Sequence, residues 1–331
     1  MLVALMKFSF TVERYFVVDS VNTQPSPKPQ FQNIIKGLIS LSRWKEQLYL
    51  VSLTFLGGLI AHSVYGIQLD WRIFMVALAN FLSVTFAFMI NDMEDAEDDA
   101  ANPISAKRNP ITNGMLDLKT AWIACGVVVL IALLGYLAGG LIVLMIGVLN
   151  LTLSFLYSWK PVRLKSSTIG LDVVSHTLML GGLLPLGGYF VSTSQVHPAI
   201  IFITLAIILG STYGQIYNQL RDFDADSKAG IKNVTIRAGK QNAFVLMYGA
   251  IVVAFVCALI GISQLVLPDW FFPLVAISVV IGLAMTFLFV RTDSSGKPPI
   301  DVSGRFQVGF LIALNIVLVF WVLWAMGLKI G

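Results

Sequence analysis

The chain has 331 residues, of which 57% are hydrophobic and only 12% charged, and its formal net charge is +4. A soluble protein of this size has no interior large enough to hide so much apolar surface, so the composition excludes an ordinary soluble domain and predicts a membrane protein. The small excess of positive charge gives no reason to expect a nucleic-acid partner.

The first 30 residues differ in character from the rest. Charged residues interrupt the apolar pieces of residues 1–21, which therefore lack the core of a signal peptide. Three prolines in residues 23–30 predict an extended linker. We expect an N-terminal tail and linker over 1–30 and one membrane domain over 31–331, whose residues 31–47 begin as a helix lying on the membrane surface.

Nine apolar runs in the remaining chain are long enough to cross a bilayer. They cover residues 48–66, 72–90, 121–138, 140–157, 168–190, 198–218, 242–262, 271–290 and 307–328. We therefore predict an all-α polytopic membrane protein with nine transmembrane helices. Acid-rich segments follow the second and the sixth run, four spans apart, which favours a bundle of two four-helix pseudo-repeats plus one helix.

The basic residues predict the orientation of these spans. If the N-terminus is cytoplasmic, every lysine and arginine except Arg72 and Lys329 lies on the cytoplasmic side. We thus expect an integral, multi-pass protein in which the N-terminus and the polar loops after even-numbered spans are cytoplasmic.

The densest acidic segment, Asn91–Asp99, follows the second run and contains six acidic residues in nine. If the helix continues through it, Asn91, Asp95 and Asp99 lie near one face. Carboxylates beside lipid repel one another and need a compensating cation, and oxygen ligands on one face suit a hard divalent ion. The same spacing recurs after the sixth run, at Asn218, Asp222 and Asp226.

Basic residues follow both acidic segments and also occupy the loop Tyr157–Lys165. Acid and base on one face are what a diphosphate–Mg²⁺ complex requires, because carboxylates hold the metal while lysine and arginine bind phosphate oxygens. A solvated acidic loop is the alternative for the first segment. Ordinary positive-inside charge is the alternative for the basic residues, and it is preferred for Lys36, Lys119, Lys160, Lys240 and Lys297.

These motifs resemble the UbiA superfamily of intramembrane prenyltransferases. That family has nine membrane helices, an N-D-x-x-D-x-x-x-D motif after helix two and a D-x-x-x-D motif after helix six; here they read Asn91–Asp99 and Asp222–Asp226. The segments Lys107–Gly114 and Tyr157–Lys165 resemble further family segments. Pro161 stands where many members have lysine; either Lys160 or Lys165 can substitute for it, and Lys165 is favoured.

The resemblance implies Mg²⁺-dependent transfer of a prenyl group from a prenyl diphosphate donor to a hydrophobic or aromatic acceptor among the membrane lipid, with release of pyrophosphate. The implied metal ligands are Asn91, Asp92, Asp95, Asp99, Asp222 and Asp226. The implied substrate-binding residues are Arg43, Asn91, Lys107, Arg108, Tyr157, Lys165, Asn218 and His176. The implied catalytic residues are Asp95, Asp99, Asp222, Asp226 and Asp172.

Asp172 and His176 form an ionisable pair, four residues apart, within the fifth run. They either bind the acceptor and take its proton, or form a self-satisfied hydrogen-bonded pair that fixes helix packing.

Two functions from other classes compete with prenyl transfer. A transporter of a divalent cation or organic anion shares buried acids and repeats, but its acids should lie near the bilayer midplane. A lipid-alcohol phosphotransferase also uses an acidic Mg²⁺ site, but the D-G-x-x-A-R block expected of that family is absent from the sequence.

Overall fold

The computed structural model describes residues 31–327 except residues 102, 168, 229, 231 and 294–296. The predicted tail and linker, residues 1–30, lie outside the described residues. Within the described part of the chain every regular element is a helix. The all-α fold class is thereby confirmed.

Nine helical segments of the described chain are long and apolar enough to cross a membrane. They are η1 with α4 (Leu48–Tyr65), α5 (Trp71–Glu94), α8 (Leu118–Gly139), α9 (Leu141–Ser158), α10 with η3 and α11 (Leu171–Phe190), α12 (Pro198–Arg221), α15 (Lys240–Ile262), α16 (Phe271–Leu288) and α17 (Val302–Ala325). They correspond one to one with the nine predicted runs, so the prediction of a multi-pass membrane protein is also confirmed.

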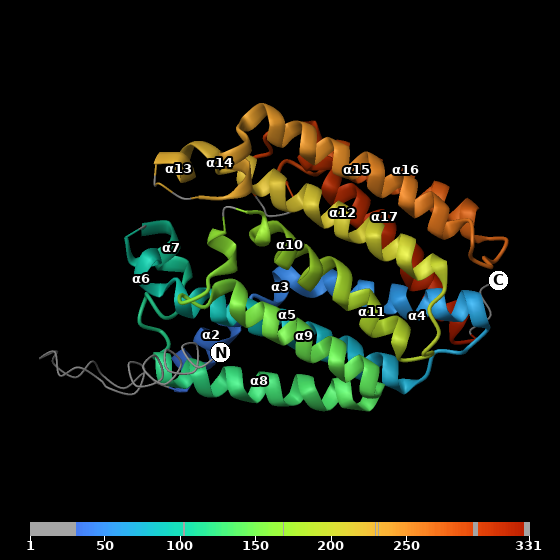
Figure 1. The fold of residues 1–331 in the computed structure, drawn as a ribbon, viewed down its shortest axis with the longest axis horizontal. Coiled ribbons are helices and arrows are strands. Elements are labelled where there is room, and N and C mark those ends of the chain that lie inside the picture. Colours follow the sequence, from blue (N-terminus) through green and yellow to red (C-terminus); the bar gives the residue numbers. More distant parts are fainter. Residues whose placement is uncertain are drawn as a thin grey trace, which may run out of the picture.

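Shorter helices lie before and between the spans. They are α2 (Phe31–Ser42), α3 (Trp44–Gln47), α6 (Ala96–Ala100), α7 (Pro103–Arg108), η2 (Leu164–Ser166), α13 (Phe223–Lys228) and α14 (Val234–Ala238). Figure 1 shows α6 and α7, which follow α5, at the same end of the bundle as α13 and α14, which follow α12. The two acidic motifs therefore lie at one end of the molecule.

Several span ends differ from the predicted ones. The helices α5 and α12 continue to Glu94 and Arg221, past the predicted ends at 90 and 218, so that the first polar residues of both motifs are helical. The helix α17 begins at Val302 instead of 307, because the side chain of Asp301 accepts a hydrogen bond from the backbone N–H of Gly304 and caps it. Gly140, at φ 108°, separates α8 from α9 as expected.

Close backbone contacts and a buried amide hold the spans together. A Cβ atom on Gly57 of α4 or on Gly188 of α11 would collide with a carbonyl oxygen of the other helix, so glycine is required at this crossing. Asn80 of α5 donates to Thr54 Oγ1 (2.7 Å) and to the Leu184 carbonyl (3.1 Å), and it accepts from the Tyr136 hydroxyl (2.9 Å). This single buried side chain thereby links four spans.

Candidate active site

The two acidic motifs have the same backbone conformation. The N–H of Asp95 donates to the Asn91 carbonyl, and the N–H of Asp222 donates to the Asn218 carbonyl, so each helix completes its last turn at an aspartate. Asp95 has φ −90° and ψ 0°, and Asp222 has φ −91° and ψ 3°. In each motif the N–H of the last aspartate then bonds back to this central aspartate. Both helices end at the same point of the motif, yet the hydrogen bonds between residues four apart continue through it.

The central acid of the first motif is bound by two cations from the loop between α9 and α10, which we call the 159–170 loop. The Lys165 ammonium lies 2.5 Å from Asp95 Oδ2, and the Arg163 guanidinium lies 2.9 Å from Asp95 Oδ1. Lys165 also donates to the Asn91 side-chain oxygen at 2.9 Å. The 159–170 loop is thus fastened to the end of α5 by charge.

Asp92 lies apart from these contacts. Its carboxylate is buried and receives two hydrogen bonds from Arg43, from Nη2 at 2.8 Å and from Nε at 3.2 Å. The Arg108 guanidinium lies 3.4 Å from the same carboxylate and 3.8 Å from the carboxylate of Asp99. Although Asp92 was expected to be a metal ligand, the structure directs its oxygen atoms to arginines.

Two of these arginines have an unusual backbone. Among the described residues, Arg43 (φ 46°) and Arg163 (φ 43°) are the only non-glycine residues with positive φ. This left-handed conformation is costly for a residue with a side chain, and such strain gathers at functional sites. Each of the two arginines uses it to reach an acid of the first motif.

Many members of the family that these motifs resemble have a lysine where this chain has Pro161. The two candidates to replace it, Lys160 and Lys165, have different surroundings. Lys160 pairs with Glu97, whose side chain is 86% exposed, whereas Lys165 is itself only 15% exposed and reaches Asp95. Burial lowers the pKa of the Lys165 ammonium below its usual value, and the charge of Asp95 opposes that shift. The preference for Lys165 agrees with these contacts.

The acids of the second motif have fewer and longer contacts with cations. Asp222 lies 3.3 Å from its chain neighbour Arg221 and 3.6 Å from the Lys297 ammonium. Asp226 accepts a hydrogen bond from Asn233 at 3.3 Å, and Asn218 is exposed. Burial, and after it the negative charge on Asp222, raise the pKa of Asp226 above its usual range. The acids of this site are therefore held by longer contacts than the central acid of the first motif.

Asp172 and His176 contact different partners, so they do not form the mutual pair considered as an alternative. Asp172 is fully buried, and its Oδ2 accepts from the Gln219 amide at 2.8 Å. Its Oδ1 has no hydrogen-bond partner among the described residues. The ring of His176 faces Tyr157, with ring centroids 5.9 Å apart.

Gln219 carries the Asp172 contact further, to the segment that follows the second motif. Its side-chain oxygen accepts from the Thr235 hydroxyl at 2.7 Å, while its amide nitrogen holds Asp172. The segment from Lys165 to Asp172 consequently contacts the first motif at one end and the surroundings of the second motif at the other. This connection places both motifs around the N-terminal end of α10 (Figure 1).

The oxygen donors of the two motifs fit a magnesium ion in chemistry. The described residues contain no group of three acidic, histidine or cysteine side chains already gathered around a metal position. In the first motif, Asp92 and Asp95 are paired with the internal cations Arg43 and Lys165. Carboxylate and carboxamide oxygens are nevertheless the ligand type that Mg²⁺ prefers, and the mutual repulsion of Asp222 and Asp226 favours a bound cation.

Some residues at this site were not expected from the sequence. Arg163 lies within the basic loop Tyr157–Lys165, but its position alone indicates no role, and Gln219 and Asp293 carry no recognisable sequence signal. Lys297 was interpreted as ordinary surface charge. Lys107, which was expected to bind substrate, is exposed on α7.

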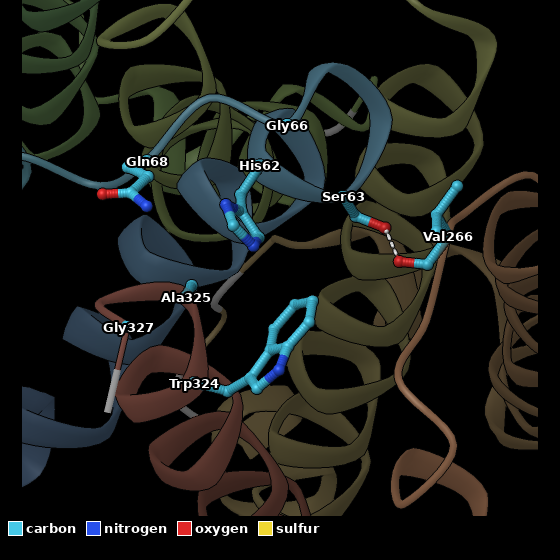
Figure 2. A pocket seen from close by; sticks show the side chains of 8 residues that line it. All are labelled: His62, Ser63, Gly66, Gln68, Val266, Trp324, Ala325 and Gly327. Carbon is cyan, nitrogen blue, oxygen red and sulfur yellow. Dashed lines mark hydrogen bonds between the residues drawn. The ribbon is translucent and has the colours of Figure 1, made fainter. Parts of the chain in front are cut away.

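A cavity of about 400 Å³ lies elsewhere, at the opposite end of the bundle. Figure 2 shows His62, Trp324 and Gln68 around it, with the Ser63 hydroxyl donating to the Val266 carbonyl. Its lining comes from the ends of α4 and α17 and the loops beside them. It is distant from both acidic motifs and is not part of the candidate active site.

Known proteins resemble the chain over most of its length. The sequence is 27% identical to digeranylgeranylglyceryl phosphate synthase of Methanococcus aeolicus over 211 residues, covering 64% of this chain and 71% of that enzyme. It is 24% identical to 1,4-dihydroxy-2-naphthoate octaprenyltransferase of Bacillus subtilis over 260 residues, covering 76% of each.

A solved structure shares the fold. A UbiA homologue from Archaeoglobus fulgidus, bound to GPP and Mg²⁺, superposes with a TM-score of 0.64 at 16% identity, covering 88% of this chain and 99% of that one. The sequence model of the UbiA prenyltransferase family matches residues 50–306, which include both acidic motifs. The chain therefore belongs to the UbiA prenyltransferase family and is a membrane-embedded prenyltransferase.

Proposed function

We propose that the protein transfers a prenyl group from a prenyl diphosphate to a lipophilic or aromatic acceptor, in a Mg²⁺-dependent reaction that releases pyrophosphate. The observation that carries this proposal is the pair of matching Asn-x-x-x-Asp-x-x-x-Asp turns at one end of the bundle (Figure 1). Basic side chains contact the central acid of the first motif. The relatives support the proposal, since one is named as a synthase of a prenylated glyceryl phosphate and the other as an octaprenyltransferase for a naphthoate.

The diphosphate of the donor lies between the two motifs in this proposal. The residues that would hold magnesium are Asn91, Asp95, Asp99, Asn218, Asp222 and Asp226. When bound, Mg²⁺ supplies positive charge that neutralises phosphate oxygens and stabilises departing pyrophosphate. Asp92 is assigned to holding Arg43 and Arg108, because its carboxylate is already directed to them.

Lys165 and Arg163 exchange partners when the donor binds. In the structure both cations pair with Asp95 from the 159–170 loop. With magnesium held by Asp95, Lys165 and Arg163 would be available to donate to phosphate oxygens. With Arg43, Lys107 and Arg108 they take up the charge that appears on pyrophosphate as the bond between the allylic carbon and oxygen breaks.

The acceptor meets the allylic carbon beside the N-terminal end of α10. The carbon becomes cation-like as pyrophosphate leaves with the bonding electron pair, and an acceptor carbon or oxygen then forms the new bond. Asp172 has a buried carboxylate oxygen without a partner among the described residues, and it is our candidate for binding the acceptor or receiving its proton. Tyr157 and His176, whose rings face each other, border this position.

The reaction takes place at the cytoplasmic side in this proposal, within a single catalytic domain over 31–331. Apart from Arg72, the basic residues of the described chain lie in the elements and loops at the motif end, as the positive-inside rule requires. A transporter is not supported, since both acidic motifs stand at the ends of spans rather than at the midplane.

Mass spectrometry of lipids tests the function directly. Cells with and without the protein are supplied with isotopically labelled prenyl diphosphates of several chain lengths, and we expect a labelled lipid only where the protein is present. Purified protein in liposomes should release pyrophosphate from the same donor when the lipid extract is added. Movement of ions across these liposomes, without pyrophosphate release, would contradict the proposal.

A further inference from the structure

The loop between α16 and α17 is anchored to the second motif by a buried ion pair. Asp293 is buried, and its carboxylate receives a hydrogen bond from the Arg221 guanidinium at 2.6 Å. Arg221 is the last residue of α12 and directly precedes Asp222. A buried pair of opposite charges is costly to separate, so the position of Asp293 relative to the second motif is fixed.

The same carboxylate also sets the backbone around Lys297. The backbone N–H of Lys297 donates to Asp293 Oδ1 at 3.1 Å, and the N–H of Asp293 donates to the Lys297 carbonyl at 2.9 Å. A second tether follows at once, because the Ile300 N–H donates to the Tyr217 hydroxyl at 2.9 Å. Lys297 is therefore held between two attachments to α12.

The ammonium group of Lys297 faces the second motif without being committed to it. It lies 3.6 Å from Asp222 Oδ2, and its side chain is 54% exposed. It also lowers the pKa of Asp226, against the larger effect of burial. Another lysine near this motif, Lys240, pairs at 2.9 Å with Asp224, an acid outside the repeated spacing.

We propose that Lys297 binds phosphate oxygens of the donor diphosphate at the second motif, and that the Arg221–Asp293 pair positions it. This inference rests on the proposed prenyl transfer and adds a phosphate-binding residue from the α16–α17 loop. A long contact to a half-exposed carboxylate leaves the ammonium free to turn toward a ligand, whereas a buried pair beneath it keeps its backbone in place. The first motif has Lys165 in the corresponding role.

Kinetics of the Lys297→Ala variant test the binding role. With geranyl diphosphate as donor and saturating Mg²⁺, we expect KM to rise about tenfold, the loss of one charge-assisted contact, while kcat changes by less than about twofold. Lys297→Arg should restore most of the affinity. Arg291→Ala is the matched control, because Arg291 is an exposed cation in the same loop.

Direct binding separates this inference from the proposed function. Calorimetry with Mg²⁺ and inorganic pyrophosphate should show about tenfold weaker binding to Lys297→Ala than to Arg291→Ala. If both variants match the wild type while Asp222→Asn is inactive, the role of Lys297 is overturned and prenyl transfer stands. If the wild type transfers no prenyl group and binds no pyrophosphate, both fail together.

The positioning role of Asp293 requires a double-mutant comparison. Asp293→Asn keeps an oxygen for the Lys297 N–H but removes the charge that holds Arg221. We expect it to raise the KM for geranyl diphosphate several-fold in the wild type and to add nothing in the Lys297→Ala background. An additional increase in that background would show that Asp293 acts by another route and would overturn the positioning claim.

Discussion

The two acidic motifs have the same backbone conformation, but cations lie closer to the central acid of the first motif than to that of the second. In the first, Asp95 is 19% exposed and is bound by Lys165 and Arg163 at 2.5 and 2.9 Å. In the second, Asp222 is 40% exposed, and its cation contacts are 3.3 and 3.6 Å long. An equal spacing of acids therefore does not give two equal sites.

This difference in cation contacts indicates that the two motifs have different roles. The first motif holds cations that can be transferred to a phosphate, and its acids are kept in place meanwhile. In the second motif the contacts between Asp222 and its two cations are longer, at 3.3 and 3.6 Å. We infer that a cation enters at the second motif first, because the internal contacts that it displaces there are longer than those at Asp95.

The largest expected effect shows what the two motifs have in common. Asp95→Asn and Asp222→Asn should each lower kcat/KM for prenyl transfer at least about 1,000-fold, because both remove charge that neutralises the diphosphate through the metal. Pyrophosphate release by purified protein measures it. Glu97→Gln and Asp224→Asn are matched controls, since these acids lie in the same segments but are 86% and 77% exposed. Near-normal activity of either Asp variant would remove that motif from the site.

Stability should separate the motifs clearly. Asp92→Ala removes the carboxylate that pairs with Arg43, whose side chain is only 11% exposed. We therefore expect the free energy of unfolding to fall by about 3–5 kcal/mol. Asp226→Ala loses one 3.3 Å hydrogen bond and relieves repulsion from Asp222, so we expect a change within about 1 kcal/mol. Thermal unfolding in detergent compares them. Equal losses would show that the first motif is not the more tightly compensated one.

The sequence predicted the spans well because a bilayer demands long apolar runs. It missed the ends where polar residues continue a helix. For example, it placed the start of the ninth span at 307, although Arg305 fits inside α17 because its guanidinium donates to the carbonyls of Val290 and Thr286. The π-helical turn η3, Leu178–Gly182, within the fifth span also left no recognisable pattern.

The sequence predicted the acids of the site better than their partners. Regular spacing marks Asn91, Asp95 and Asp99, because a helix turns spacing into a shared face. No such rule connects Arg163 or Lys297 to an acid, since each is delivered by a loop whose path depends on tertiary contacts. The left-handed backbone at Arg163 directs the first of these side chains. The buried Asp293, which accepts a hydrogen bond from the Lys297 N–H, helps to set the path of the second loop.

A smaller effect distinguishes the two lysines of the 159–170 loop. Lys165→Ala should lower kcat/KM by about 10- to 100-fold, because a largely buried charge-assisted contact to the leaving group is lost. Lys160→Ala should stay within about threefold, since Lys160 pairs with the exposed Glu97. Steady-state kinetics with saturating acceptor measures both. A larger loss for Lys160 would reverse the assignment of the family lysine.

The smallest expected effect concerns ligand-linked stability and the order of binding. Mg²⁺ with pyrophosphate at about tenfold above the dissociation constant should stabilise the protein by about 1.4 kcal/mol, and EDTA should reverse the rise in Tm. Chelation should also abolish donor binding. If a cation enters at the second motif first, Asp222→Asn should remove the Tm rise given by Mg²⁺ alone, whereas Asp95→Asn should retain part of it. An equal response of both variants would contradict this order and make the two motifs a single metal site.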